Sequence, residues 1–259
     1  MGSFLEQVTA ARRADAEARA AGGGLDRARD AAASAPPARD FASALSRPGL
    51  SLITEVKRAS PSAGDINRDV DVVEQARAYE RGGAAAISVL TEPDHFRGSL
   101  DDLRAVRDAV SVPVIRKDFI AHPLQVWEAR AAGADAVLLI VAALSQPELV
   151  MLFDLAELAG MAALVETHDA DEVARAVDGG ARIVGINTRN LATLEVDPGI
   201  VEKVRAAVPD GVTLVGESGV SSRADVETML AAGVDAVLIG EALMRAADPE
   251  AKVRELLGG

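Results

Sequence analysis

The sequence predicts an α/β protein in which eight parallel strands close into a (β/α)8 barrel, preceded by an N-terminal helical extension. Eight short apolar runs recur at intervals of about 20 to 30 residues, with helical patterns between them, as parallel βαβ units require. Polar residues stand at the carboxyl ends of many of these runs, which is typical of a barrel. The competing doubly wound sheet would place Gly-x-Gly-x-x-Gly after its first strand, and no such motif follows Val56.

Composition limits the possible partners. The 259 residues are 49% hydrophobic, enough for a substantial core, and 40 acidic against 27 basic residues give a net charge of −13. We therefore expect no nucleic acid or membrane partner, since both are anionic. The absence of cysteine excludes disulfides and fits a cytoplasmic protein, and no apolar run reaches the roughly 20 residues of a membrane span. The three histidines lie far apart without metal-site spacing, so no metal is expected.

The first 50 residues read as a helical extension. Residues 3–20 and 25–34 have helical patterns separated by three glycines, and Pro36 and Pro37 end the second. Phe41, Ala44 and Leu45 predict a short helical turn. We expect residues 1–50 to pack on a barrel of residues 51–259 within one structural domain.

The first strand is predicted at Leu52 to Val56 and carries an unusual pair of charges. Side chains alternate along a strand, so Glu55 and Lys57 share one face with Ile53. Burying both charges is expensive unless they are paired or in use. A structural ion pair is the alternative to a functional site. Pro61 and Gly64 begin the loop that follows.

The seven other strands follow helical patterns. Four come directly after helix-ending glycines, at residues 84–90, 134–140, 181–187 and 234–240, and three more span residues 112–116, 161–165 and 212–215. In a barrel the carboxyl ends of all strands meet at one mouth. The residues expected there, besides Glu55 and Lys57, are Glu92, Lys117, Asp118, Glu166, Asn187, Arg189, Glu217, Ser218, Gly240 and Glu241.

Lysine and glutamate facing each other across a partly dry pocket can act as acid and base. Burial and neighbouring charges can bring both pKa values toward neutrality, and we expect this for Lys117 and Glu166. A charge network that only closes the barrel top is the alternative. The loops after the seventh and eighth strands contain Gly219 and Gly240. Because loops at these two places often bind phosphate through backbone N–H groups, we expect a phosphorylated substrate.

Four features are expected to have structural roles. Tyr79 and Trp127 lie in helical patterns and should pack against the outside of the barrel. The acidic residues 169–172 should form the start of a helix, where negative charge is favourable, and His122 before Pro123 should start another.

With these residues placed, nearly the whole chain resembles the indole-3-glycerol phosphate synthases of tryptophan biosynthesis. The resemblance is carried by EVKRASPSAG (55–64), ISVLTE with FRGS (87–99), VIRKDFI (114–120), ADAVLLIVAAL (134–144), LVETHD (164–169), GINTRNLATLEVD (185–197), GESGV (216–220) and IGEALM (239–244). It implies a (β/α)8 barrel with an N-terminal helical arm. It also implies a lyase reaction, in which 1-(2-carboxyphenylamino)-1-deoxyribulose 5-phosphate closes its ring and loses carbon dioxide and water. No cofactor is implied, because forming the aromatic indole drives these steps.

The resemblance also implies roles for individual residues. Lys117 matches the general acid and Glu166 the base, while Lys57 and Glu55 match residues that assist them. Residues matching groups that hold substrate hydroxyls and the charged ring substituent are Asn187, Arg189 and Glu217. Residues matching the phosphate and substrate cradle are Ser60, Ser218, Gly219, Gly240 and Glu241, the last through its backbone N–H. Residues matching apolar positions around the anthranilate ring are Phe96, Phe119 and Leu191. Some relatives carry Lys where this chain has Ala63, which makes the first loop less positive here.

Two other functions remain open from the residues alone. Another phosphate-binding barrel enzyme is the first, although an isomerase of this type would use a cysteine, which the chain lacks, and a Schiff-base aldolase would need a lysine on the sixth strand in place of Asn187 and Arg189. A non-catalytic binding barrel is the second, but it would not need Lys57, Lys117 and Glu166 together. The chain ends soon after the eighth helix, so we expect one activity, in a monomer or weak homo-oligomer.

Overall fold

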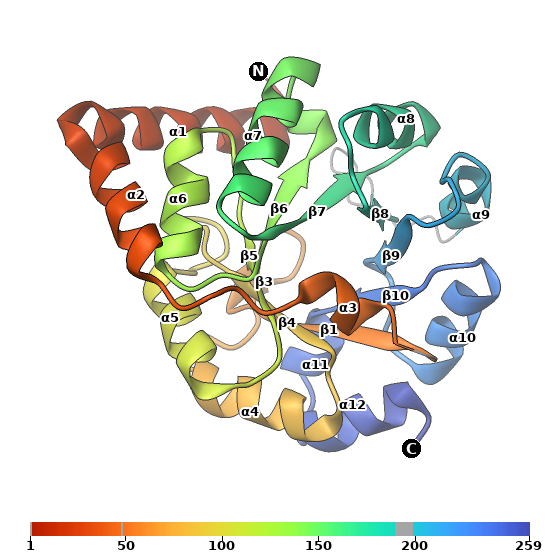
Figure 1. Cartoon of the computed structure of the whole chain (residues 1–259). Coiled ribbons are helices and arrows are strands. Elements are labelled where there is room, and N and C mark those ends of the chain that lie inside the picture. The colour runs from red at the N-terminus through yellow and green to blue at the C-terminus, as the bar shows by residue number, and fades with distance from the viewer. Residues whose placement is uncertain (1, 48, 190–198) are drawn as a thin grey trace.

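The eight predicted strands form a closed parallel barrel in a computed structural model that describes residues 2–47, 49–189 and 199–259 (Figure 1). Around the barrel the strand order is β1, β10, β9, β8, β7, β6, β5 and β4, and β4 pairs with β1 to close the ring. The strands are β1 Ser51–Val56, β4 Ala86–Leu90, β5 Val114–Lys117, β6 Ala136–Ile140, β7 Ala162–Thr167, β8 Ile183–Asn187, β9 Thr213–Glu217 and β10 Ala236–Ile239. This confirms the predicted fold class.

Helices follow the strands and cover the outside of the barrel (Figure 1). Those of the barrel are α4 Val72–Gly82, α5 Leu100–Ala109, α6 Pro123–Ala131, the 3-10 turn η2 Val141–Ala143, α7 Gln146–Leu158, α8 Ala170–Asp178, α9 Ile200–Arg205, α10 Arg223–Ala231, α11 Glu241–Met244 and α12 Pro249–Leu257. The expected helix starts are confirmed, because Asp169 and His122 are the N-cap residues of α8 and α6. None of the helices in the described ranges combines the length and apolar character that crossing a membrane requires.

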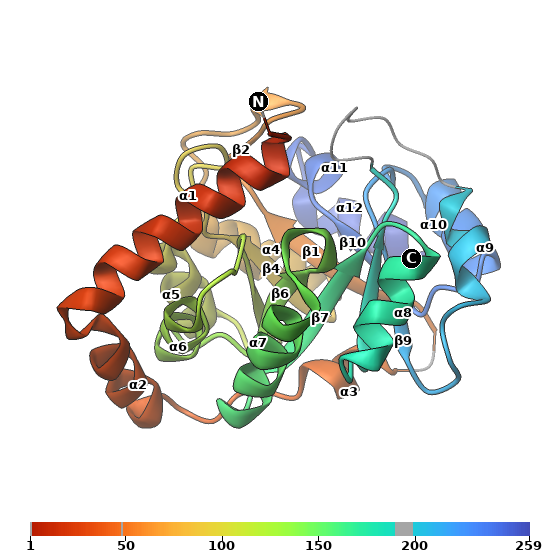
Figure 2. The same ribbon diagram turned by 90° about the horizontal axis from the view of Figure 1, so that it is seen from above.

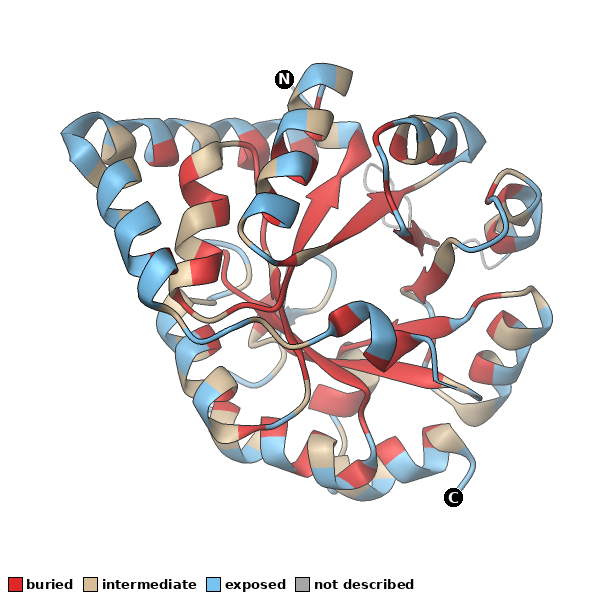
Figure 3. Cartoon of the chain, in the orientation of Figure 1, coloured by how far each residue is buried: buried red, intermediate tan, exposed pale blue. Residues whose placement is uncertain are grey.

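Alternation along the strands divides the apolar side chains into two clusters. Ile53 of β1 belongs to a cluster that fills the barrel with Ile115 and Leu164, whereas Leu52 and Val56 belong to the cluster between strands and helices. The strands are consequently buried along nearly their whole length (Figure 3). Tyr79 of α4 is fully buried in the outer cluster, as expected.

The short helix α3 (Phe41–Leu45) completes the filling of the barrel. Phe41 and Leu45 are each 1% exposed and belong to the interior cluster with Ile53. The N-cap Asp40 accepts a hydrogen bond from Ser43 N, which fixes the start of the helix. The predicted helical turn before the first strand is thus confirmed, and it contributes directly to the core.

The N-terminal extension consists of α1 (Phe4–Arg19), the π-helical segment η1 (Ala20–Gly24) and α2 (Leu25–Ser34). Gly23, with φ at 75°, makes the bend between the two helices. α2 runs alongside α6, and α1 packs against α6 and η2 (Figure 2). Arg12 anchors α1, because its guanidinium donates to both carboxylate oxygens of Asp118 at 3.1 and 2.9 Å.

The loop after β1 contains a two-stranded antiparallel sheet that the sequence did not predict. β2 (Ala59–Ser60) pairs with β3 (Gly64–Asp65), and Gly64 has φ at 65° in the turn. Ser60 Oγ accepts a hydrogen bond from Ala63 N at 3.2 Å. These contacts hold the predicted loop in a defined course beside the barrel mouth.

Candidate active site

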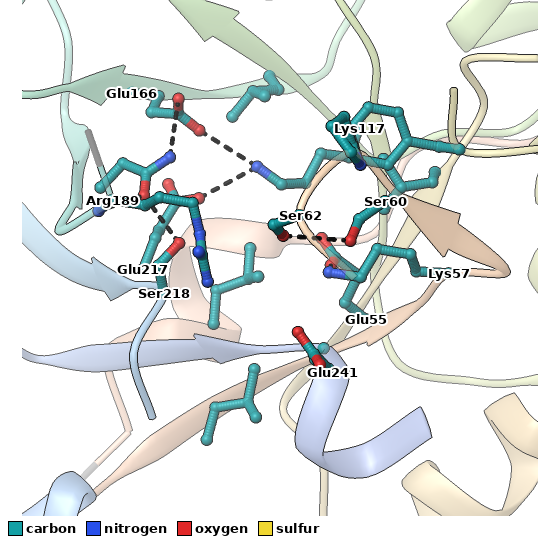
Figure 4. A pocket seen from close by; sticks show the side chains of 18 of the residues that line it. Glu55, Lys57, Ser60, Ser62, Lys117, Glu166, Arg189, Glu217, Ser218 and Glu241 are labelled. Atoms are coloured by element: carbon teal, nitrogen blue, oxygen red, sulfur yellow. Dashed lines mark hydrogen bonds and ion pairs between the residues drawn. The ribbon is translucent and has the colours of Figure 1, made fainter. Parts of the chain in front are cut away.

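A cavity of about 510 Å³ opens at the carboxyl end of the strands (Figure 4). Most of the site residues predicted from the sequence line it: Glu55, Lys57, Ser60, Phe96, Lys117, Asp118, Phe119, Glu166, Asn187, Arg189, Glu217, Ser218, Gly219, Gly240 and Glu241. The exceptions are Glu92, which does not line the cavity, and Leu191, which lies outside the described residues. Residues distant in sequence therefore meet at one mouth, as the barrel predicts.

The charges at the end of β1 form the expected pair. Lys57 Nζ lies 2.7 Å from Glu55 Oε1, and the Glu55 side chain is only 3% exposed. Gly240 provides room for this pair, because a Cβ there would lie 2.4 Å from Glu55 Oε1 and 3.0 Å from Lys57 Nζ. The absence of a side chain at position 240 thus has a steric reason in addition to any role in binding phosphate.

Lys117, at the end of β5, contacts two glutamates, one on β7 and one on β9 (Figure 4). Its Nζ donates to Glu166 Oε2 of β7 at 3.2 Å and to Glu217 Oε2 of β9 at 3.1 Å. Both glutamate side chains are 3% exposed and that of Lys117 is 16% exposed. One cation thus serves two buried carboxyl groups, and the charges of the three groups do not cancel if both carboxyls are ionised.

The pKa values in this triad differ from the expectation. Burial acts to lower the pKa of Lys117, but the charges of Glu217, Glu166 and Glu55 outweigh burial and raise it. Burial acts to raise the pKa of Glu166, but Lys117 and His168 outweigh burial and lower it. The prediction that these two pKa values approach neutrality was therefore wrong, since the two groups stabilise each other's charged forms.

Glu217 is the member of the triad whose pKa does move toward neutrality. Burial, together with the negative charge of Glu166, raises the pKa of Glu217 to about 7, although Lys117 opposes the rise. Gly185 accommodates this carboxyl group, because a Cβ at position 185 would lie 2.2 Å from Glu217 Oε1. The site therefore combines a fixed ammonium, a fixed carboxylate and a carboxyl group that can exchange its proton near pH 7.

Asn187, at the end of β8, connects the triad to the neighbouring loops. Its Nδ2 donates to Glu166 Oε1 at 3.2 Å, and its Oδ1 accepts from Ser218 Oγ at 2.8 Å and from Arg189 N at 3.1 Å. These three contacts fix the orientation of the amide, and two of them are hydrogen bonds accepted by its carbonyl oxygen. Asn187 is therefore placed to hold Glu166 in position as well as to contact a substrate.

The loops after β9 and β10 form the remaining wall. Ser218 and Gly219 both have positive φ, at 68° and 74°, which is uncommon for serine and marks a tightly determined turn. α11 begins at Glu241, directly after Gly240, so its first backbone N–H groups face away from the helix body. The Glu241 carboxylate accepts a hydrogen bond from Arg245 Nε at 3.0 Å. This agrees with the expectation that Glu241 contributes to an anion-binding cradle through its backbone N–H alone.

Aromatic rings form the apolar wall of the cavity. Phe96 and Phe119 have ring centroids 6.1 Å apart, and Phe4 of α1 lies 6.3 Å from Phe119. Phe4 and Leu5 were not among the predicted site residues. No local pattern identifies them, because their place depends on how α1 crosses the barrel.

Two strand-end acids have structural roles. The Glu92 carboxylate accepts from the backbone N–H groups of Asp94, His95 and Phe96 and so shapes the loop that carries Phe96. Asp118 binds Arg12, Arg116 and Thr91, and the two arginines lower its pKa to about 2 against the effect of burial. Neither acid is free for the chemistry of the cavity.

His168 is a site residue that the sequence reasoning missed. Its Nε2 lies 3.6 Å from Glu166 Oε1 and its Nδ1 lies 3.1 Å from Glu172 Oε2. The signal was present, because residues 166 and 168 stand two apart at a strand end, like Glu55 and Lys57.

Within residues 2–47, 49–189 and 199–259, no three His, Asp or Glu side chains are arranged to hold a metal ion.

The fold and this constellation define a (β/α)8-barrel enzyme with a lysine–glutamate centre and loops suited to binding an anion. The family model of indole-3-glycerol phosphate synthase matches residues 5–256, and the chain belongs to this family. The chain is 51% identical to the indole-3-glycerol phosphate synthase of Mycobacterium avium, over 99% of this chain and 93% of that protein. It is 49% identical to that of Mycobacterium tuberculosis over the same shares.

Solved structures with low sequence identity share the fold. Thiamine phosphate pyrophosphorylase from Pyrococcus furiosus is 19% identical, with a TM-score of 0.61 over 80% of this chain and 93% of its own. The N-acetylmannosamine-6-phosphate 2-epimerase of Clostridium perfringens is 16% identical, with a TM-score of 0.60 over 74% of this chain and 86% of its own. At these identities the likeness supports the barrel alone.

Proposed function

We infer that the chain catalyses the reaction of its family, in which 1-(2-carboxyphenylamino)-1-deoxyribulose 5-phosphate is converted to indole-3-glycerol phosphate, carbon dioxide and water. Family membership makes the chain a carboxy-lyase of tryptophan biosynthesis. The observation that carries the assignment of residues is the position of Lys117, within 3.2 Å of carboxylate oxygens of both Glu166 and Glu217. A barrel that only bound a ligand would not require this arrangement.

Ring closure needs a proton donor at the ribulose carbonyl, and Lys117 is proposed for this role. Its raised pKa keeps it protonated, so it stabilises negative charge developing on the oxygen and donates a hydrogen bond to it. Glu166 stays ionised beside it and is proposed as the base that removes the proton lost on the way to the indole. Glu217, with a pKa of about 7, can give or take a proton during loss of the hydroxyl.

The other lining residues are proposed to bind the substrate. Lys57, oriented by Glu55, faces the cavity as a second cation and can pair with an anionic substituent or assist as a second acid. Arg189 and Asn187 are proposed to hold hydroxyls and the ring carboxylate. Phe96 and Phe119 offer apolar faces to the anthranilate ring, a role also proposed for Leu191.

The phosphate is proposed to bind on the opposite wall. Ser218, Gly219, Gly240 and Glu241 line that wall, where their backbone N–H groups would bind the phosphate, and Ser60 lies in the loop after the neighbouring strand β1. No cofactor is expected, because formation of an aromatic ring drives the decarboxylation and dehydration.

The test is to supply the purified chain, in the presence of EDTA, with carboxyphenylamino-deoxyribulose phosphate or, separately, with phosphoribosylanthranilate. We expect indole fluorescence and carbon dioxide from the first compound and no turnover of the second. Turnover of phosphoribosylanthranilate alone would favour an isomerase, and binding of either compound without turnover would favour a non-catalytic barrel.

Three further expectations stay proposals. We propose that residues 1–50 are an extension packed on the barrel of residues 51–259 as one structural domain. The hydrogen bond from Arg12 of α1 to Asp118 of the barrel supports the packing of the extension on the barrel. A monomer or weak homo-oligomer and a cytoplasmic location are also proposed, the latter because a chain without cysteine suits a reducing compartment.

A further inference from the structure

His168 lies between a buried carboxylate at the active site and a carboxylate near the surface. Nδ1 is 3.1 Å from Glu172 Oε2, and the same oxygen accepts the backbone N–H of His168 at 2.8 Å. Glu172 stands in the first turn of α8, where Glu172 N donates to the N-cap Asp169. Two hydrogen bonds to this carboxylate, together with the capping bond that fixes the start of the helix, therefore hold the imidazole in one orientation.

This orientation determines which ring nitrogen can exchange a proton. A carboxylate only accepts hydrogen bonds, so Nδ1 carries a hydrogen directed at Glu172. Nε2 then has no hydrogen when the ring is neutral, and it faces Glu166 Oε1 at 3.6 Å. Within the part of the chain that the structure describes, Nε2 is buried without a hydrogen-bond partner. Such a group is costly unless a proton lies between it and the facing oxygen.

The charges around His168 favour that proton. Glu172 faces it from α8, Glu166 from its own strand end and Glu217 from β9, while Lys117 binds the far side of Glu166. Burial acts to lower the pKa of His168, but these three carboxylates outweigh burial and raise it. The imidazolium can then donate from Nδ1 to Glu172 and from Nε2 toward Glu166.

The proposed reaction uses Glu166 as its base, and a base must be ionised when the substrate loses its proton. The Glu166 side chain is 3% exposed, so solvent gives its negative charge little support and a neighbouring cation is favourable. Lys117 supplies one such cation at Oε2, and the imidazolium of His168 supplies a second at Oε1.

We propose that His168 is a positioning residue for Glu166, oriented by Glu172. Its imidazolium directs the Nε2 hydrogen at Glu166 Oε1 and so keeps this carboxylate ionised and in place to act as the base. The inference rests on the proposed role of Glu166.

The kinetic test uses His168→Ala, with His122→Ala as the matched control, because His122 is the N-cap of α6 and does not line the cavity. We expect His168→Ala to lower kcat about 10-fold with KM nearly unchanged, and added imidazole to restore most of the loss. His122→Ala should keep the wild-type kcat, and added imidazole should not change it. Unchanged kcat in His168→Ala, or a loss that imidazole does not reduce, would overturn the proposal.

A second test does not depend on activity or on the folding of His168→Ala. The chain has only three histidines, so ring nitrogen NMR can follow each titration separately. We expect Glu166→Gln and Glu172→Gln each to lower the titration midpoint of His168 and to leave that of His122 unchanged. If Glu166→Gln leaves the titration midpoint of His168 unchanged, the proposed coupling between His168 and Glu166 is refuted. Coupling in a wild-type chain that forms no indole would instead refute the proposed function.

Discussion

Glu217 is buried beside Lys117 and Glu166, and its position raises its pKa from 4.5 to about 7. The protonated form is therefore favoured in the folded protein. The contribution of Glu217 to the unfolding free energy is fully present below pH 4.5, where this residue is also protonated in the unfolded chain. This contribution is lost as the pH rises through 7. The rise corresponds to on the order of 3 kcal/mol of unfolding free energy.

Glu217→Gln should remove this pH dependence, since an amide does not titrate. We expect the unfolding free energy of the wild type, relative to that of Glu217→Gln, to fall by about 2 to 3 kcal/mol between pH 5 and pH 8. Urea denaturation at the two pH values measures the difference. Equal changes in the two proteins would show that Glu217 titrates normally.

At the scale of elements, the end of β10 leaves room for the charged pair at the end of β1 because residue 240 is a glycine. Gly240→Ala would place a methyl group 2.4 Å from Glu55 Oε1, so the pair of Glu55 and Lys57 must shift. We expect kcat/KM to fall at least about 10-fold, because small displacements of catalytic groups are costly. Gly22→Ala is the matched control, since a Cβ there meets nothing within 4 Å and φ is −87°. Equal kcat/KM for the two variants would contradict the steric account.

The attachment of α1 to the barrel gives a second prediction at this scale. Arg12→Ala removes one partner of the buried Asp118 and should lower the unfolding free energy by about 3 kcal/mol. Arg13→Ala breaks a pair with Glu148 whose side chains are about one-third exposed, and should cost less than about 1 kcal/mol. Because Phe4 and Leu5 of α1 line the cavity, KM should rise in Arg12→Ala only. Thermal or urea unfolding and steady-state kinetics check both effects, and similar losses in the two variants would show that Arg12 is not a special anchor.

For the whole molecule, the barrel and most of its site could be predicted because their signals are local. Alternation along a strand placed Glu55 beside Lys57, and glycines before apolar runs marked strand starts such as Ala136. The same alternation pairs Glu166 with His168, but His168 was considered only as a possible metal ligand. Local patterns could therefore have revealed this contact.

Other features depend on contacts between distant segments. The position of Phe4 at the cavity follows from the path of α1, and the opposite pKa shifts of Glu166 and Glu217 follow from which groups surround each carboxyl. Both glutamates are strand-end residues beside Lys117, so sequence alone cannot separate them. The distinction requires the three-dimensional arrangement.

The central claim is that Lys117 is the proton donor of an indole-forming lyase, and its most direct test is the turnover of carboxyphenylamino-deoxyribulose phosphate by Lys117→Ala, followed by indole fluorescence. We predict that kcat falls at least about 10²-fold while the variant stays folded and still binds the substrate. Lys252→Ala, which breaks only a pair with Glu255 on α12, should match the wild type. Near-normal turnover by Lys117→Ala would contradict the account.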